Sequence, residues 1–180
     1  MRLEYEHRLH YPREQVWSAL VDPQVLARIL PGVEKFEAVG ADRYDIAVHL
    51  GVPAVKGSFR GSIEVAESQF PARYTLRGQG KGATGWVRGG AQITLDACAE
   101  GTRVTSAIDA QVGGRIAGVG QRMLEGVARA LAQELFEALD REIAGRKATG
   151  SRMLFFARVI SGWLRAFFER GDRAEPGSRT

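Results

Sequence analysis

Six segments between residues 33 and 112 alternate apolar and polar side chains at every second position, and this pattern limits the possible folds more than any other feature. Successive side chains of a β-strand point to opposite faces of its sheet, so a period of two predicts strands with one buried and one solvated face. The six segments are Val33–Val39, Arg43–Leu50, Val55–Val65, Ala72–Gly80, Gly85–Ala97 and Thr102–Val112. A seventh alternating segment covers Arg2–His10, and together they predict an antiparallel sheet of seven strands.

Helical patterns flank this block of strands. Pro12 opens a predicted helix, and Asp22-Pro23 ends it and starts a second short helix that runs to Leu30. After Gly113-Gly114 the period changes to that of a helix, which Gly145 is expected to end. Its apolar stripe is Ile116, Met123, Leu124, Val127, Leu131, Leu135 and Ala138. The predicted class is therefore α+β, with a curved sheet that wraps a long C-terminal helix and buries its stripe.

The net charge of +4 is concentrated at the C-terminal end of the chain. Residues 146–173 carry seven basic and two acidic side chains, whereas the first 145 residues are close to neutral. This distribution argues against a nucleic-acid binder and places any anionic partner at the tail. The single cysteine, Cys98, excludes an internal disulfide and a cysteine-rich metal site. With no secretory signal and no apolar run that could span a bilayer, a cytoplasmic location is expected.

The inward face of the predicted sheet mixes large side chains with Gly57, Gly61, Gly78, Gly80 and Gly89. Protein interiors pack to a density of about 0.75, so glycines that face the long helix would leave space for an apolar ligand. The alternative is that the glycines only let the sheet bend. The residues expected to line a cavity are Tyr44, Val48, Phe59, Tyr74, Leu76, Ile93, Ile108, Met123, Leu124 and Val127.

No pattern of catalytic or metal-binding residues lies on the predicted inward faces. His7, His10 and His49 are expected mostly on the polar faces of strands, and no paired spacing of histidines or cysteines suggests a metal site. The inward polar side chains are Tyr44, Tyr74 and Ser106, which are expected to satisfy hydrogen bonds in the core. Glu134 interrupts the stripe of the long helix and is expected to reach solvent. We therefore predict no catalytic residue and no metal.

The C-terminal tail has an amphipathic pattern of its own. Residues 152–170 place aromatic and aliphatic side chains on one arc of a helix and arginines on the other, which is typical of a helix that lies on a membrane surface. The predicted membrane-binding residues are Phe155, Phe156, Arg158, Ile160, Trp163, Leu164, Arg165 and Phe167. The predicted organisation is a domain over residues 1–145, a flexible linker over 146–151, this helix, and disorder over 171–180. The alternative is that the tail helix packs on its own domain or on a partner protein.

Four strings in the sequence resemble a known family. They are YPREQVWSALVDP, LPGVEKFE, VPAVKGSFRG and VGGRIAGVGQRML, and the resemblance covers about residues 1–144. They resemble the START-like superfamily of helix-grip folds and, more narrowly, the family of the G subunit of carbon monoxide dehydrogenase. That resemblance implies a protein at the inner face of the cytoplasmic membrane that anchors or serves a molybdenum hydroxylase of the carbon monoxide dehydrogenase type.

The resemblance also bears on the ligand. It implies that the cavity holds an isoprenoid quinone or another apolar lipid, with no covalently bound cofactor. Two alternatives remain open. One is a START-like enzyme, a cyclase or hydrolase-like protein acting on a polyketide or steroid-like substrate. The other is a pure membrane anchor that binds no ligand.

Overall fold

The computed structural model describes residues 1–52 and 55–148, and it confirms the helix-grip arrangement of seven antiparallel strands followed by a long helix. The strands are β1 (Arg2–Leu9), β2 (Val33–Gly40), β3 (Arg43–Leu50), β4 (Gly57–Gln69), β5 (Arg73–Gly82), β6 (Gly85–Cys98) and β7 (Gly101–Gly114). The helices are α1 (Arg13–Leu20), α2 (Pro23–Ile29), the short 3-10 helix η2 (Arg115–Val119) and α3 (Gln121–Ala148).

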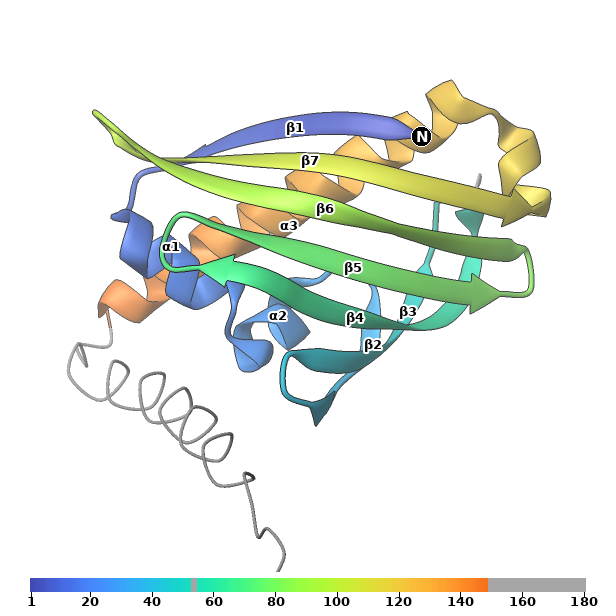
Figure 1. Cartoon of the computed structure of the whole chain (residues 1–180), viewed down its shortest axis with the longest axis horizontal. Helices are drawn as coiled ribbons and strands as arrows, with labels where there is room; N and C mark the ends of the chain where they lie inside the picture. Colours follow the sequence, from blue (N-terminus) through green and yellow to red (C-terminus); the bar gives the residue numbers. More distant parts are fainter. Residues whose placement is uncertain (53–54, 149–180) are drawn as a thin grey trace, which may run out of the picture. The chain divides into compact units, whose positions relative to one another are not determined.

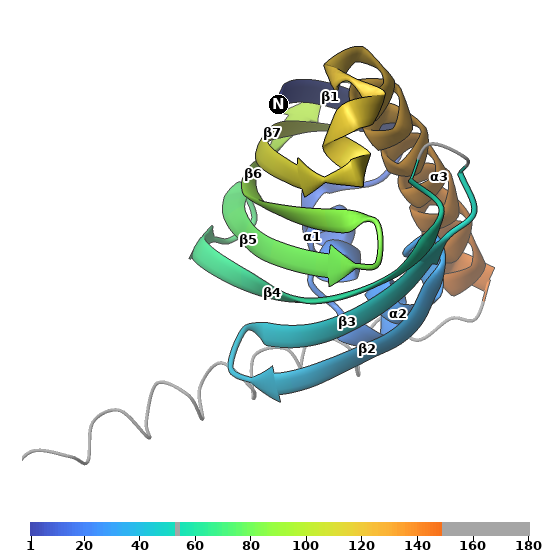
Figure 2. The same cartoon turned by 90° about the vertical axis from the view of Figure 1, so that its right-hand side faces the viewer.

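The strands lie in the order β1-β7-β6-β5-β4-β3-β2, so each strand from β2 to β7 pairs with its neighbours in sequence. The connection that contains α1 and α2 carries the chain from one edge of the sheet to the other. Figure 2 shows the sheet curving from β1 round to β2, with α3 along its concave side. The predicted class and strand count are therefore right.

Two of the inward glycines allow this curvature. A Cβ atom added to Gly61 would lie 1.9 Å from the carbonyl oxygen of Gln79, and one added to Gly89 would lie 2.2 Å from the carbonyl oxygen of Asp109. In both cases the neighbouring strand occupies the space that a side chain would need. Gly61 and Gly89 are therefore bends, as the second interpretation of the glycines predicts.

The main core lies at the end of the sheet covered by α1 and α2 (Figure 1). Trp17 of α1 is 3% exposed and meets the ring of Tyr74 edge to face, with 5.3 Å between ring centroids. Helix α3 contributes the fully buried side chains Phe136, Leu139 and Ile143. These three residues were not part of the predicted stripe.

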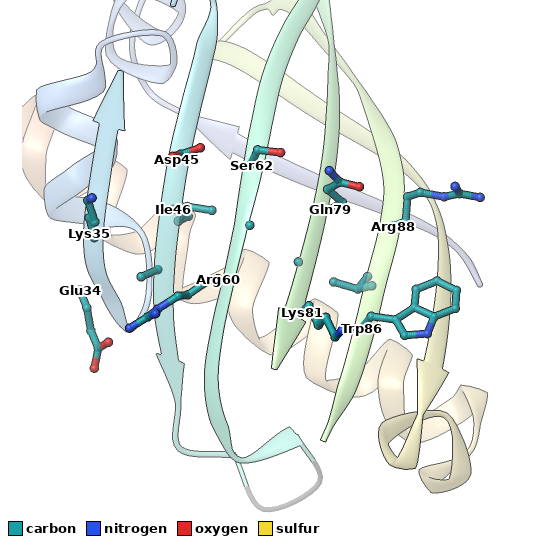
Figure 3. A pocket seen from close by; sticks show the side chains of 14 residues that line it. Glu34, Lys35, Asp45, Ile46, Arg60, Ser62, Gln79, Lys81, Trp86 and Arg88 are labelled. Carbon is teal, nitrogen blue, oxygen red and sulfur yellow. The ribbon is translucent and has the colours of Figure 1, made fainter. Parts of the chain in front are cut away.

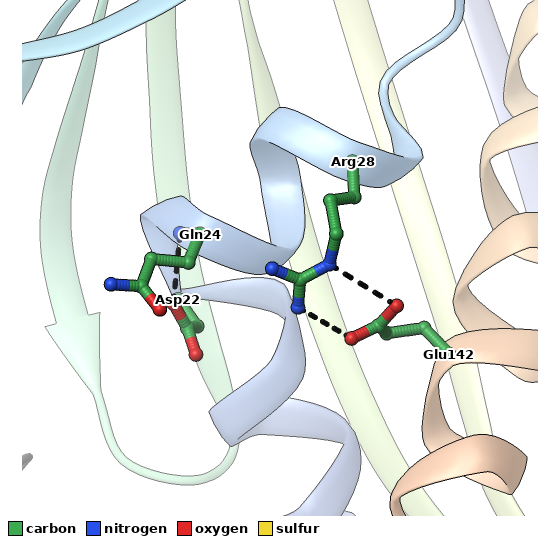
Figure 4. A network of polar contacts seen from close by, with 4 residues as sticks. All are labelled: Asp22, Gln24, Arg28 and Glu142. Carbon is green, nitrogen blue, oxygen red and sulfur yellow. Dashed lines mark hydrogen bonds and ion pairs between the residues drawn. The ribbon is translucent and has the colours of Figure 1, made fainter.

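A polar contact also fastens α2 to α3 near this core (Figure 4). Asp22 caps α2 by accepting a hydrogen bond from the backbone N–H of Gln24, and Pro23 occupies the first turn, as expected of an Asp-Pro helix start. From the same helix, Arg28 donates hydrogen bonds from Nη2 and Nε to the two carboxylate oxygens of Glu142, at 2.5 and 3.4 Å. The pair fixes α2 against the end of α3 that is already buried.

The predicted end of the long helix at Gly145 is wrong, because α3 continues to Ala148. A glycine within a helix is less favourable than alanine by about 1 kcal/mol, which does not break a helix. It ends one only in a left-handed conformation, and Gly145 does not adopt that conformation. The predicted tail helix over 152–170 and the C-terminus over 171–180 lie outside the described residues, and the linker predicted over 146–151 overlaps the last helical residues.

Within the part of the chain that the structure describes, no helix has the length and apolar character needed to span a membrane.

Candidate ligand-binding site

A cavity of about 440 Å³ lies between the sheet and the N-terminal half of α3. Small-molecule sites usually have volumes of about 300–1,000 Å³, so this space could hold a ligand. Strands β3 to β7, η2 and α3 all contribute to its walls. The large apolar residues of these walls are Ile46, Val48, Leu50, Val55, Phe59, Ile63, Leu76, Val87, Ile108, Val112, Ile116, Leu124, Val127 and Leu131.

Six of the ten residues predicted to line a cavity do line this one. They are Val48, Phe59, Leu76, Ile108, Leu124 and Val127. The structure brings them together from four strands and the first turns of α3, as alternation and helical phase predict. Whether they contact a ligand stays a prediction.

The other four predicted residues lie elsewhere. Tyr74 and Ile93 share the inward face but belong to the main core near α1, because alternation identifies a face and not a position along the strand. Tyr44 stacks on Phe36 of β2, with ring centroids 5.0 Å apart. Met123 lies in the first turn of α3 and is 55% exposed.

Two glycines of β5 leave the cavity its space. A Cβ atom on Gly78 would lie 3.4 Å from the carbonyl oxygen of Ser62 and 3.8 Å from Cγ1 of Ile63. One on Gly80 would lie 3.7 Å from Cγ1 of Val87. These are ordinary contacts, so a side chain could stand at either position, and its absence leaves room. The two interpretations of the glycines therefore both hold, at different positions.

The side chains that point into the cavity are apolar. Arg60, Ser62 and Gln79 border it, but their side chains lie on the opposite face of the sheet (Figure 3). Ser106 and Tyr74 are buried in the sheet but do not border the cavity, and burial raises the pKa of the Tyr74 hydroxyl, which keeps it neutral. In the described ranges, no group of His, Cys, Asp and Glu side chains could hold a metal ion. The arrangement can bind an apolar group but offers no acid–base pair.

The structure corrects the prediction for His7, which faces inward from β1. It has the same parity as the buried Leu3 and Leu9, and its ring stacks on Phe136 with centroids 5.0 Å apart. Burial lowers the pKa of the imidazole, and this outweighs the opposite effects of Asp140 and Glu137. His7 does not border the cavity. Glu134 is exposed, as predicted.

The family model for the G subunit of carbon monoxide dehydrogenase (CoxG) matches residues 6–144. Among solved structures, a conserved protein from Geobacillus kaustophilus is 36% identical, with a TM-score of 0.75 over 80% of this chain and 94% of that one. A protein from Thermus thermophilus is 16% identical, with a TM-score of 0.62 over 81% of this chain and 99% of that one. A Chromobacterium violaceum protein is also 16% identical, with a TM-score of 0.59 over 79% and 96%. These last two share the fold alone. The chain matches no curated protein.

Proposed function

We propose that this chain, which belongs to the CoxG family of carbon monoxide dehydrogenase, is an accessory protein that binds an apolar lipid, such as an isoprenoid quinone. It would serve or anchor a molybdenum hydroxylase of the carbon monoxide dehydrogenase type at the inner face of the cytoplasmic membrane. The observation that carries the proposal is the cavity of about 440 Å³ with its apolar lining. Native interiors seldom leave a void of this size unfilled.

The lining favours binding over catalysis. General acid–base chemistry needs a positioned side chain whose pKa suits proton transfer within reach of the substrate. The side chains directed into the cavity are aliphatic or aromatic, and the nearest buried phenol, that of Tyr74, lies in the main core. An apolar ligand gains about 25 cal/mol for each Å² of surface that it removes from water, so this wall can hold a lipid without hydrogen bonds.

The shape of β5 argues against the pure anchor. A sheet that needed only curvature would use glycines where neighbouring backbones crowd, as at Gly61 and Gly89. Gly78 and Gly80 meet no such crowding, and they border the cavity. Glycine at these positions gives up apolar contacts that a larger side chain could make, which a binding site explains and an anchor does not.

The membrane and enzyme parts of the proposal depend on the family and on the sequence of the tail. The aromatic and basic pattern of residues 152–170 supports attachment to an anionic bilayer. The family name supports a hydroxylase as the partner.

Native mass spectrometry of the full chain, purified without detergent and followed by solvent extraction, tests the ligand. We expect an added mass that leaves with the organic phase and has the mass of a quinone or another lipid. The chain freed of lipid should then bind decylubiquinone in a saturable manner. A chain that carries no lipid and binds neither decylubiquinone nor a fluorescent fatty acid would contradict the proposal.

A further inference from the structure

We propose that the outer face of the sheet carries a second site, a basic trough that receives an acidic segment of a partner protein. The proposal does not require that the inner cavity hold a ligand. It rests on the shape of the outer face, on its uncompensated positive charge and on an exposed tryptophan beside that charge.

The trough is a hollow of about 1,200 Å³ across strands β2 to β6 (Figure 3). Small residues leave this recess, because Ala47, Ser62 and the glycine pair Gly61 and Gly80 lie where larger outward side chains would fill it. Longer side chains stand around it. Gly61 and Gly80 border the inner cavity as well, so at this point only backbone separates the two spaces.

Two positive charges face each other in the trough. Arg60 of β4 and Lys81 of β5 are direct partners in the strand register, and both are exposed. Like charges directly opposite each other in a sheet are destabilising. Among the described residues, no acidic side chain forms an ion pair with either of them. By contrast, the outer-face arginines Arg43 and Arg77 pair with Glu64 and Glu67, at 3.3 and 2.7 Å.

Trp86 extends this basic surface with an apolar one. It is paired with Lys81 across β5 and β6 and is 41% exposed. A Cβ atom on Gly113 would lie 2.3 Å from Cε2 of Trp86, so the indole lies over that glycine on β7. Arg88, two residues further along β6, also borders the trough. Tryptophan and arginine are the residues that most often dominate protein–protein binding energy.

The form of the site favours a protein segment over a membrane surface. A bilayer surface cannot enter a recess in the sheet, whereas an extended segment can. The rim also includes two acidic residues, Glu34 and Asp45, on the side of β2 and β3. These carboxylates would repel a uniformly anionic bilayer, but beside a peptide they would fix which part of it carries the acidic residues.

Nuclear magnetic resonance of the ¹⁵N-labelled full chain can test the proposal, with unlabelled octaglutamate peptide as the probe. The indole N–H signal of Trp86, assigned with a Trp86→Phe variant, reports on the trough, and that of Trp163 reports on the basic tail. We expect a saturable shift of the Trp86 signal that weakens as salt is raised. The double variant Arg60→Ser, Lys81→Ser should bind at least tenfold more weakly by this signal.

The matched control is the double variant Arg43→Ser, Arg77→Ser, which removes the same charge from the same face but at ion-paired positions. It should keep its affinity within about threefold. Loss of repulsion should leave the Arg60→Ser, Lys81→Ser protein at least as stable as the parent, and thermal unfolding checks this. Equal losses in both double variants, or a shift confined to Trp163, would overturn the proposal. So would weaker flotation of the Arg60→Ser, Lys81→Ser chain with phosphatidylglycerol vesicles while octaglutamate leaves Trp86 unmoved, because the trough would then face a membrane.

Discussion

Replacing Gly78 with leucine tests the inner cavity most directly. The Cβ atom would stand 3.4 Å from the carbonyl oxygen of Ser62 and 3.8 Å from Cγ1 of Ile63, so the backbone need not move. Because Gly78 borders the cavity from the middle of β5, the rest of the side chain would occupy the space that we assign to a lipid. Ala91→Leu, on the neighbouring strand β6, approaches the same space from a second position.

The substitution should raise stability and weaken ligand binding at once. Full burial of a leucine is worth about 1.5–3 kcal/mol, and loss of glycine from a strand adds about 0.5–1 kcal/mol. Since the new side chain is only partly covered, we expect a gain of about 1–2 kcal/mol, or about 2–8 °C in Tm. Four carbons of ligand displaced at about 0.8 kcal/mol each would weaken binding by about 100-fold.

Thermal unfolding of the lipid-free protein and titration with decylubiquinone measure the two effects. Gly61→Ala is the matched control, because its Cβ atom would lie 1.9 Å from the carbonyl oxygen of Gln79. A single methyl group there should lower Tm, since overpacking costs about 1–3 kcal/mol, and it should not fill the cavity.

A Gly78→Leu protein that is stable and still binds decylubiquinone with the parent affinity would refute the assignment of the ligand to this cavity. If Gly78→Leu and Gly61→Ala were equally destabilised, the distinction between open and crowded glycines would fail.

Three further outcomes follow from the structure and the sequence. Burial lowers the pKa of His7, so the unfolded chain binds more protons between that lowered pKa and about 6.5; stability should therefore fall as pH drops through this window, and urea titrations of a His7→Phe variant should show less of this loss. The full chain should float with anionic liposomes and a chain ending at Gly150 should not; flotation of the shortened chain would place the membrane contact elsewhere. Substitution of Tyr44, Tyr74 or Glu134 should abolish no turnover, and a substrate whose conversion stops with one of them would favour the enzyme alternative.

The alternation of apolar and polar residues was enough to predict the sheet. Each strand is half-buried, so its pattern records which face meets the core, and all seven strands were found. The prediction for His7 was wrong although the same rule covers β1, because Leu3 and Leu9 already place that side chain on the inward face. The end of α3 was mispredicted for a different reason. A single glycine weakens a helix only slightly, and neighbouring helical residues outweigh it.

The site was harder to predict than the fold, since a cavity depends on where residues lie along their strands. Tyr74 and Leu76 are two positions apart on one face of β5, yet the first packs under Trp17 and the second borders the cavity. The glycines pose a similar problem. Gly61 and Gly80 are paired in the register, but only Gly61 points at the backbone of its neighbour. That difference arises from the local coiling of two paired strands, which no single segment of sequence records.

The division of α3 into two halves explains how one small domain can be stable and still keep an open site. Phe136, Leu139 and Ile143 are at most 3% exposed, so the C-terminal half joins the main core completely. Leu124 and Val127 of the N-terminal half are only partly buried against the cavity. Apolar surface left uncovered in this way gives up about 25 cal/mol per Å², a loss that the domain can bear because its main core lies at the other end of the sheet. A bound lipid would recover that burial where it is missing, and its binding would then stabilise the first turns of α3 more than the rest of the fold.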